Sequence, residues 1–296
     1  MILRHFPKTC PPPGWPNLVI HARGREVDYP EHAGPLSLKC VIKGEEIHEV
    51  GGIPYSVDQR SMLLLNHGRP YSSRSRGFEE VETFSLFFEQ GFAATTLRGL
   101  VAPPDQLLDE PFLEGSQSVE FFETLYPRSS ELTLLLQRMR RKTELWQTES
   151  IWLEERLHEV LAQLLREHSQ LTRASENLPA ARAATRTEQY RRLLRARDFI
   201  EGNVCRAIDL ATIASVACLS TFHLHRLFQQ AFGETPNQYL TRRRLELAHH
   251  LLATTDLPIW KICQQVGYQS QSSFSRLFSA RYGESPLRMR QCLAAP

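Results

Sequence analysis

The stretch Ser220-Thr-Phe-His-Leu-His-Arg-Leu-Phe-Gln-Gln-Ala-Phe-Gly-Glu-Thr-Pro236 decides how the last third of this chain folds. It recurs at a period of 50 as Ser270-Gln-Ser-Ser-Phe-Ser-Arg-Leu-Phe-Ser-Ala-Arg-Tyr-Gly-Glu-Ser-Pro286. In both copies a serine opens an amphipathic stretch, and a glycine with a proline three residues later closes it, as at the two ends of a helix. Upstream, Ile213-Ala214 matches Ile262-Cys263 at a period of 49, so the second copy has one extra residue in its turn. Each copy is therefore predicted to be a helix-turn-helix.

The second helix of each copy is predicted to have a buried side and a free side, because successive residues of a helix are about 100° apart. The inner side of the first copy includes Leu224, Leu227 and Phe228, and that of the second copy Phe274, Leu277 and Phe278. The outer sides contain no acidic residue. They consist of Phe222, His225, Arg226 and Gln229 in the first copy and Ser272, Ser275, Arg276 and Ser279 in the second.

The outer sides suit the major groove of double-stranded DNA. Arginine can bond the two acceptors of guanine or a phosphate, His, Gln and Ser offer short hydrogen bonds, and Phe222 can meet a thymine methyl. The charge distribution agrees with this partner. Residues 187–296 carry 14 Lys or Arg against 8 Asp or Glu, a balance of +6, whereas residues 1–186 carry 21 against 25, a balance of −4. A basic C-terminal third is typical of a DNA-binding domain.

The segment between the copies, Pro236 to Thr254, reads as one amphipathic helix that sets the spacing of the two motifs. A spacing near one duplex turn, about 34 Å, would let both recognition helices enter adjacent major-groove segments. The run Arg242 to Arg244 on this helix has two possible roles, a solvated face or a set of contacts to phosphates.

Residues 190 to 293 resemble the AraC/XylS family of bacterial transcription regulators. The resemblance rests on Ile262-Cys-Gln-Gln-Val-Gly-Tyr268, Ser270-Gln-Ser-Ser-Phe-Ser-Arg-Leu-Phe278 and Gly283-Glu-Ser-Pro286. It implies a sequence-specific regulator, more often an activator, that works with RNA polymerase. It also implies that bases are read from Phe222, His225 and Arg226 in the first motif and from Gln271, Ser272, Ser275 and Arg276 in the second.

Two positions depart from the family pattern. Cys263 replaces the usual alanine, a slightly larger buried group that we expect to be tolerated. Cys218 occupies a turn position where the second copy has Gly267, and a left-handed backbone at Cys218 would be strained. The serines of the second motif are short and uncharged, so we expect that motif to contribute less base discrimination than the first.

Residues 17 to 92 have the pattern of strands. Leu36, Leu38, Cys40 and Ile42 alternate with Ser37, Lys39, Val41 and Lys43, which predicts a strand with one buried face. Turn signals at roughly ten-residue intervals favour an antiparallel barrel or sandwich. Residues 1 to 16 contain a proline-rich arm.

Helices are predicted over Val119–Leu125, 130–142 and 149–171. The last has a broad apolar stripe, which packs either on the chain's own β-domain or against a second copy as a dimer seam. Small and polar residues over 172–187 indicate a linker. The stripe consists of Leu153, Leu157, Val160, Leu161, Leu164 and Leu165.

Together these patterns predict an α+β protein. Residues 1–103 form a β-rich, cupin-like sensor domain with an N-terminal arm, 104–171 a helical dimerisation region, 172–187 a linker and 188–296 the DNA-binding domain with two helix-turn-helix motifs. The cupin-like, ligand-binding and dimerising roles are implied by the family resemblance, and residues 54–72 are similar to a barrel segment of such members. The effector is a small molecule that the sequence does not identify.

Two other functions remain open for the N-terminal half. It could only dimerise or bind a protein partner, or it could be a metal-binding cupin enzyme. No H-x-H pair, nucleophile elbow, phosphate loop or Cys/His nucleophile occurs, so we expect no catalysis and no cofactor. The candidate metal ligands are His21, His32, His48 and His67, with Glu31, Glu45, Glu46 and Glu49 near them.

Other classes are excluded by composition. Apolar residues make up 42% of the 296 residues and charged residues 23%, as in ordinary globular proteins. No apolar run approaches the roughly 18 residues that a membrane-spanning helix needs, and the N-terminus lacks the pattern of a secretory signal. The six cysteines are widely spaced, without a CxxC pair, which favours reduced thiols. We therefore expect a cytoplasmic protein.

Overall fold

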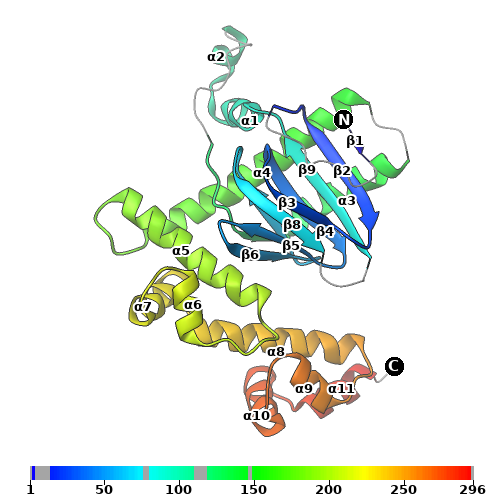
Figure 1. The fold of residues 1–296 in the computed structure, drawn as a ribbon, viewed down its shortest axis with the longest axis vertical. Coiled ribbons are helices and arrows are strands. Elements are labelled where there is room, and N and C mark those ends of the chain that lie inside the picture. Colours follow the sequence, from blue (N-terminus) through cyan, green and yellow to red (C-terminus); the bar gives the residue numbers. More distant parts are fainter. Residues whose placement is uncertain (1, 4–13, 76–79, 110–118, 146–148, 295–296) are drawn as a thin grey trace. The chain divides into compact units, whose positions relative to one another are not determined.

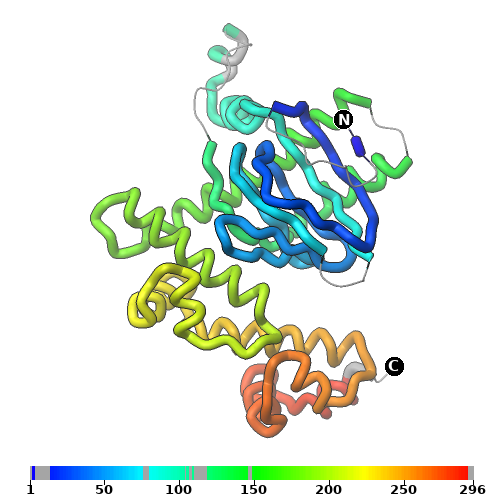
Figure 2. The backbone as a smooth tube through the Cα atoms, in the orientation of Figure 1, coloured from blue at the N-terminus to red at the C-terminus, as the bar shows by residue number. Residues whose placement is uncertain are grey.

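The computed structural model describes residues 2–3, 14–75, 80–109, 119–145 and 149–294. The chain forms two compact units, Met1–Glu176 and Asn177–Pro296 (Figures 1 and 2). Most of the predicted proline-rich arm, residues 4–13 with Cys10, lies outside the described residues. The five cysteines within them are free thiols.

The N-terminal unit contains two β-sheets. The six-stranded sheet has the order β1-β2-β9-β4-β7-β10 and the four-stranded sheet the order β3-β8-β5-β6 (Figure 1). Apart from the parallel pair β1–β2, neighbouring strands are antiparallel, as predicted. The strands are β1 (Ile2–Leu3), β2 (Leu18–Gly24), β3 (Asp28–Ala33), β4 (Leu36–Lys43), β5 (Glu46–Val50), β6 (Ile53–Val57), β7 (Ser61–Leu65), β8 (Pro70–Ser75), β9 (Val81–Phe88) and β10 (Leu125–Pro127).

Each face of the six-stranded sheet is covered by a different layer. One face packs on the four-stranded sheet through a core that includes Val41, Leu63, Val57 and Tyr71. The other face packs under helices through a core that joins Leu38, Phe84 and Leu86 to helical side chains. The helices of this unit are α1 (Phe92–Val101), α2 (Pro104–Asp109), α3 (Ser130–Glu144) and α4 (Ser150–Glu176). The chain is thus an α+β protein with a cupin-like N-terminal half, as predicted.

The prediction that β4 buries only one face was wrong. Its alternating apolar residues do meet the helices, but Ser37 and Lys39 on the opposite face are also buried, with exposures of 0% and 5%. The period of two identified the two faces correctly. It could not show that a second sheet covers the polar one, because that sheet is formed by other segments of the chain, before and after β4.

The predicted helix over Val119–Leu125 was also wrong. Residues 119–124 form no regular element, and Leu125 begins β10, which pairs with β7. The side chain of Asn66 satisfies this backbone instead, because its Nδ2 donates to the carbonyl oxygen of Phe121 at 2.9 Å and its Oδ1 accepts from the amide of Phe121 at 2.9 Å. The backbone N–H and C=O of Phe121 therefore bond an amide side chain 55 positions away instead of helical neighbours.

The predicted helices over 130–142 and 149–171 are α3 and α4. The apolar stripe of α4, from Leu153 to Leu165, is between 0% and 8% exposed and belongs to the core under the six-stranded sheet. Of the two open alternatives, the stripe therefore packs on its own β-domain. Within the expected linker, residues 172–176 lie in α4 and residues 183–187 in the next helix, so 177–182 connect them.

The C-terminal unit is helical. Each predicted helix-turn-helix is present, α6 with α7 and α9 with α10, and α8 lies between them (Figure 1). The turn between α9 and α10 is one residue longer than that between α6 and α7, as the repeat predicted. The helices are α5 (Ala183–Gly202), α6 (Leu210–Val216), α7 (Thr221–Phe232), α8 (Pro236–Thr254), α9 (Ile259–Gln265), α10 (Gln271–Tyr282) and α11 (Pro286–Ala294).

In the part of the chain that the structure describes, no helix combines the length and the apolar content that crossing a bilayer requires.

The turn of the first motif contains Cys218 at φ 50°, and the matching Gly267 of the second motif has φ 84°. A left-handed backbone costs about 1–2 kcal/mol for a residue with a Cβ atom. Cys218→Gly should therefore stabilise the C-terminal unit, by up to about 1 kcal/mol after the larger unfolded-state entropy of glycine is counted. Slower hydrogen–deuterium exchange of the α6 and α7 amides is the expected readout.

The matched change Gly267→Ala should act in the opposite direction. A Cβ atom there would lie 3.1 Å from the Arg244 Cζ and 3.1 Å from the Cys205 carbonyl oxygen, on a left-handed backbone. Faster exchange in α9 and α10 is expected. Equal exchange in Cys218→Gly and the parent protein would show that the first turn is not strained.

Candidate nucleic-acid interface

The recognition helix of the first motif, α7, is fixed at both ends. Its N-cap Ser220 accepts a hydrogen bond from the amide of His223, and its C-cap Gly233 has φ 76°, which a glycine adopts without strain. Leu224, Leu227 and Phe228 are at most 2% exposed, so this side holds the helix on its unit. The predicted caps and inner side are confirmed.

The opposite side of α7 is open. Phe222 is 72% exposed, and His225, Arg226 and Gln229 are also exposed. Nothing in the described part of the unit forms an ion pair or a side-chain hydrogen bond with Arg226. A 72% exposed phenylalanine is unusual on a helix whose other apolar residues are buried, and an apolar contact such as a thymine methyl would account for it.

The second helix of the second motif, α10, repeats this design with an outer side that is less open. Ser270 caps it by accepting from the amide of Ser273, and Phe274 and Phe278 are fully buried. Gln271, Ser272 and Arg276 are exposed, whereas Ser275 is partly buried. The hydroxyl of Ser272 lies 2.9 Å from that of Ser270, so it is engaged within the cap. Arg276 is thus the long cationic side chain of this face.

The arginines of α8 do not form a free basic stripe. Arg242 is ion-paired with Glu234 at 2.8 Å and with Glu246 at 2.9 Å. Arg243 is paired with Glu201 at 2.7 Å and contacts Glu246. Both side chains are about three-quarters buried, with exposures of 28% and 24%.

The third arginine, Arg244, is also occupied. Its Nε donates to the carbonyl oxygen of Val204 at 2.9 Å, its Nη2 donates to that of Arg206 at 2.6 Å, and its guanidinium lies over the ring of Tyr268. Neither of the two roles considered for this run, solvated face or phosphate contact, describes these positions. The three arginines hold α8 to neighbouring segments of its unit.

The charges of this cluster reinforce one another. Burial alone would lower the pKa of Arg242 and Arg243, but hydrogen bonds and ion pairs with Glu234, Glu201 and Glu246 outweigh it and raise both values. Burial alone would raise the pKa of Glu246, and the two arginines lower it instead. Arg242, Arg243 and Glu246 are therefore charged at neutral pH. The signal for one of them, Arg242 with Glu246, is present in the sequence as an i, i+4 spacing.

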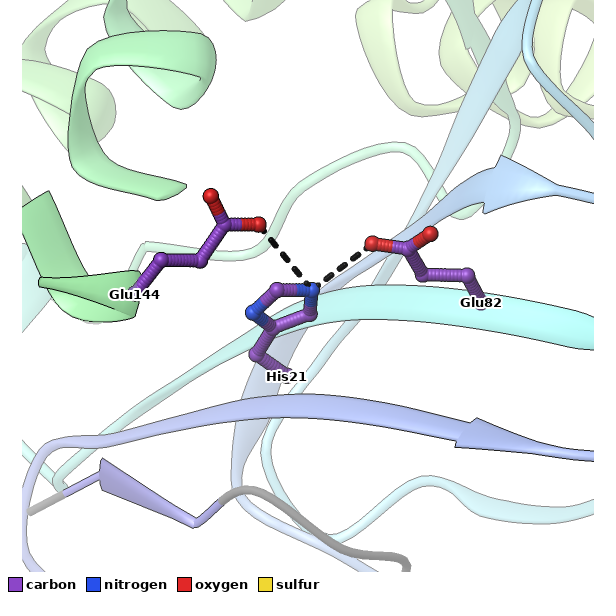
Figure 3. A group of neighbouring side chains, drawn as sticks. All are labelled: His21, Glu82 and Glu144. Carbon is purple, nitrogen blue, oxygen red and sulfur yellow. Dashed lines mark hydrogen bonds and ion pairs between the residues drawn. The ribbon is translucent and has the colours of Figure 1, made fainter. Parts of the chain in front are cut away.

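The candidate metal ligands of the N-terminal half do not come together as a set. Among the described residues, the group with suitable geometry is His21, Glu82 and Glu144, and two of these were not sequence candidates (Figure 3). His21 Nε2 lies 2.8 Å from Glu82 Oε1 and 4.0 Å from Glu144 Oε1. The remaining candidates are apart from it: His48 bonds Ser73, His32 bonds the carbonyl oxygen of Pro30, and His67 is exposed.

Two arginine side chains form ion pairs with the carboxylates of Glu82 and Glu144. Arg140 lies 3.3 Å from Glu82 and 3.4 Å from Glu144, and Arg23 lies 3.1 Å from Glu82. Burial alone would raise the pKa of Glu82, but the hydrogen bonds from His21 and Arg23 lower it. The cluster is an ion-pair network that joins β2, β9 and α3, and we assign no metal to it.

Comparisons with known proteins find relatives of the C-terminal helical part of the chain. A family model described as a helix-turn-helix domain matches residues 213–291. The chain is 41% identical over 91 residues to the probable transcriptional regulator LumQ of Photobacterium leiognathi, a match that covers 31% of this chain and 37% of LumQ. It is 31% identical over 96 residues to the regulatory protein SoxS of Salmonella typhimurium, which covers 32% of this chain and 90% of SoxS.

A third relative matches along almost the whole chain. The HTH-type transcriptional activator RhaS of Enterobacter sp. (strain 638) is 26% identical over 282 residues, covering 95% of this chain and 94% of RhaS. The two helix-turn-helix motifs and these relatives define a DNA-binding transcription regulator. The chain belongs to the AraC/XylS family.

A substitution of Arg243 tests whether the arginines of α8 have a structural role or contact DNA phosphates. Arg243→Ala should lower the free energy of unfolding by about 1–2 kcal/mol, because Glu201 and Glu246 lose a charged hydrogen-bond partner. The salt dependence of DNA binding should not change. A phosphate contact would instead flatten the slope of log K against log salt by about 0.9. Urea unfolding and a salt titration of DNA affinity measure the two effects, and a flattened slope with unchanged stability would make Arg243 a DNA contact.

Proposed function

We propose that each chain inserts α7 and α10 into adjacent segments of the major groove and reads bases through their open sides. The support is that both helices bury one side and leave the opposite side, with Arg226 and Arg276, exposed. The proposed reading residues are Phe222, His225, Arg226 and Gln229 of α7 and Gln271, Ser272, Ser275 and Arg276 of α10.

The first motif contributes more base discrimination than the second. Its face offers an arginine, a histidine, a glutamine and an exposed aromatic ring, all of which reach base edges. In α10, Ser275 is partly buried and Ser272 is hydrogen-bonded within the cap. Arg276 and Gln271 carry most of the second contact.

The protein acts as a homodimer through the outer side of α3 and α4. This side contains a groove of about 350 Å³ lined by residues of both helices, and Leu134 in it is 54% exposed. Glu131 and Arg138 lie on α3, and Glu159 and Arg166 on α4. The helices are antiparallel, since Ser129 before α3 bonds Glu167 of α4. Each end of the groove therefore combines one acidic and one basic residue, a pattern that is complementary to a second copy of itself.

Dimerisation joins the readers of two chains and lengthens the recognised site. The N-terminal half is the sensor of a small-molecule effector, which biases the arrangement of the two units around residues 177–182. The protein works in the cytoplasm, as an activator that contacts RNA polymerase, by analogy with its family.

A regulator without a small-molecule sensor is the second candidate. In that case the N-terminal half only dimerises or binds a protein partner. The observation that favours it is that the interior of the β-unit is largely filled by the buried side chains of both sheets.

The DNA-reading proposal is tested with Arg226→Ala. Loss of a bidentate contact to guanine should cost about 1–3 kcal/mol at the preferred site and relax the selectivity at one base position. Competition binding of specific against scrambled duplexes measures this selectivity. The control is Arg288→Ala, which removes an exposed arginine of α11 outside both reading faces and should leave selectivity unchanged. Unchanged selectivity in Arg226→Ala would remove Arg226 from the reading set.

The dimer is tested with Leu134→Asp, which places a charge in the groove. Sedimentation velocity should show a dimer for the parent chain and a monomer for the variant. Ile151→Asp is the matched control, because Ile151 is 71% exposed on α4 and does not line the groove. A parent chain that sediments as a monomer, or a Leu134→Asp variant that stays dimeric, would contradict the proposed interface.

A further inference from the structure

Residues 177–182, the connecting segment between α4 and α5, are held by hydrogen bonds to the C-terminal unit. Arg186 of α5 donates through Nη1 to the carbonyl oxygen of Ala180 at 2.7 Å and to that of Ala181 at 3.2 Å. The amide of Ala180 donates to the carbonyl oxygen of Leu178 at 2.9 Å. The connecting segment therefore has a defined backbone, although its small and polar residues predicted a linker.

Two further features restrict the connecting segment. Leu178 is only 4% exposed, so the segment is anchored by a buried side chain. Pro179 follows it, and a proline fixes its own backbone φ and disfavours a helical conformation at the residue before it. Gly- and Ser-rich linkers are flexible, whereas a buried side chain and a proline each reduce the number of conformations that a segment can adopt. The connecting segment is therefore stiffer than such a linker.

The first residue of the connecting segment is bonded to the recognition helix of the first motif. Gln230 of α7 donates through Nε2 to the carbonyl oxygen of Asn177 at 3.0 Å. Asn177 directly follows Glu176, the last residue of α4. Gln230 lies four residues after Arg226, and residues at that spacing share one side of a helix. The chain therefore enters the C-terminal unit beside the side of α7 that carries Arg226.

The second motif cannot form the same contact. At the period of 50, the counterpart of Gln230 is Ala280 of α10, whose methyl group cannot donate a hydrogen bond. The neighbouring positions do match between the copies, with Leu227-Phe228 in the first and Leu277-Phe278 in the second. The helix-turn-helix fold itself therefore does not require a glutamine at this position. In the first motif, its amide bonds the connecting segment.

We propose that the connecting segment is docked on the first motif and that Gln230 is a positioning residue, through which the end of α4 controls how α7 lies in the major groove. This role rests on the proposed reading of bases by α7 and goes beyond it by naming the contact that controls the reading. A hydrogen bond of an exposed side chain contributes little to stability, because water competes for both partners, so it can break and re-form without unfolding. Breaking it changes the reading of the half of the DNA site that α7 contacts and leaves the half contacted by α10 unchanged.

The test uses the full chain and its preferred duplex, selected from a random pool. Gln230→Met keeps the length of the side chain and removes the amide donor. Gln265→Met is the matched control, because Gln265 is an exposed glutamine at the end of α9, outside both reading sides. Base pairs of the site are replaced one at a time, competition binding measures each loss of affinity, and Arg226→Ala identifies the half that α7 contacts. Gln230→Met should change the losses at least about threefold in that half only, and Gln265→Met in neither half.

A double-mutant cycle separates positioning from direct contact with DNA. Leu178→Ala removes the buried anchor of the connecting segment and leaves every residue of α7 in place. If Gln230 acts through this segment, Leu178→Ala should reproduce the change in the α7 half, and the double variant should bind like either single variant. Additive effects of the two substitutions would make Gln230 a direct DNA contact and would overturn the proposal.

Hydrogen–deuterium exchange tests the docking without DNA. In Gln230→Met, the peptide that covers residues 177–182 should exchange at least about threefold faster than in the parent chain, because the connecting segment opens more often. In Gln265→Met its exchange should equal that of the parent chain. Equal exchange in Gln230→Met and the parent chain would overturn the docking.

The outcomes also separate the role of Gln230 from the proposed function. A chain that binds duplex DNA, with the same losses of affinity in Gln230→Met and in the parent chain, overturns only the role of Gln230. A chain that binds no duplex overturns the DNA-reading function, and the positioning role of Gln230 with it.

Discussion

The geometry of the DNA-binding unit depends on one helix, α8, being held rigidly against both motifs. At its start Tyr239 packs on Phe228 of the first motif, with ring centres 5.6 Å apart. Further along, Leu245, Ala248 and Leu252 belong to the core of the second motif. The 19 residues of α8 span about 28 Å, on the scale of one duplex turn. Because both cores include side chains of this one helix, α8 links the packing of the two recognition helices.

The ion pairs of α8 complete this constraint. Glu246 accepts from Arg242 and Arg243 on its own helix and lies 3.4 Å from Arg281 of α10. Arg243 reaches Glu201 of α5. Partly buried pairs that share one carboxylate are worth more than isolated surface pairs, since the side chains are already ordered by their neighbours. Arg242 and Arg243, for which the sequence left a solvated face and phosphate contacts as alternatives, therefore hold α8 to its neighbours in the unit.

What the sequence could predict follows from the range of the interactions. The caps at Ser220 and Ser270 and the two-sided second helices of the motifs depend on neighbours within one or two helical turns, so the repeat revealed them. The repeat placed Cys218 in a turn but left its backbone geometry open, and the structure shows it to be left-handed. The partners of Arg243 and the role of Asn66 depend on residues 42 and 55 positions away. A single sequence holds no local signal for such contacts. Lys39 was assigned to a strand with one polar face for the same reason, because the sheet that covers it comes from β3, β5, β6 and β8.

The two halves of the chain use buried polar groups differently. In the DNA-binding unit the buried charges are paired, which stabilises one arrangement of the helices. In the β-unit, His48 Nε2 and His32 Nε2 are buried without a hydrogen-bond partner among the residues that the structure describes. Strand β4 carries Lys39 on one face and, through Leu38 and Cys40, packs under α3 and α4 on the other.

The central claim, that one chain reads two adjacent major-groove segments, is tested most directly by chemical footprinting of the full chain on its preferred duplex. Methylation protection of guanine N7, which lies in the major groove, should reveal two protected patches for each chain, about one helical turn (roughly 10 base pairs) apart on one face of the duplex. Arg226→Ala should erase one patch and Arg276→Ala the other. A single protected patch for each chain, or two patches on opposite faces of the duplex, would contradict the account.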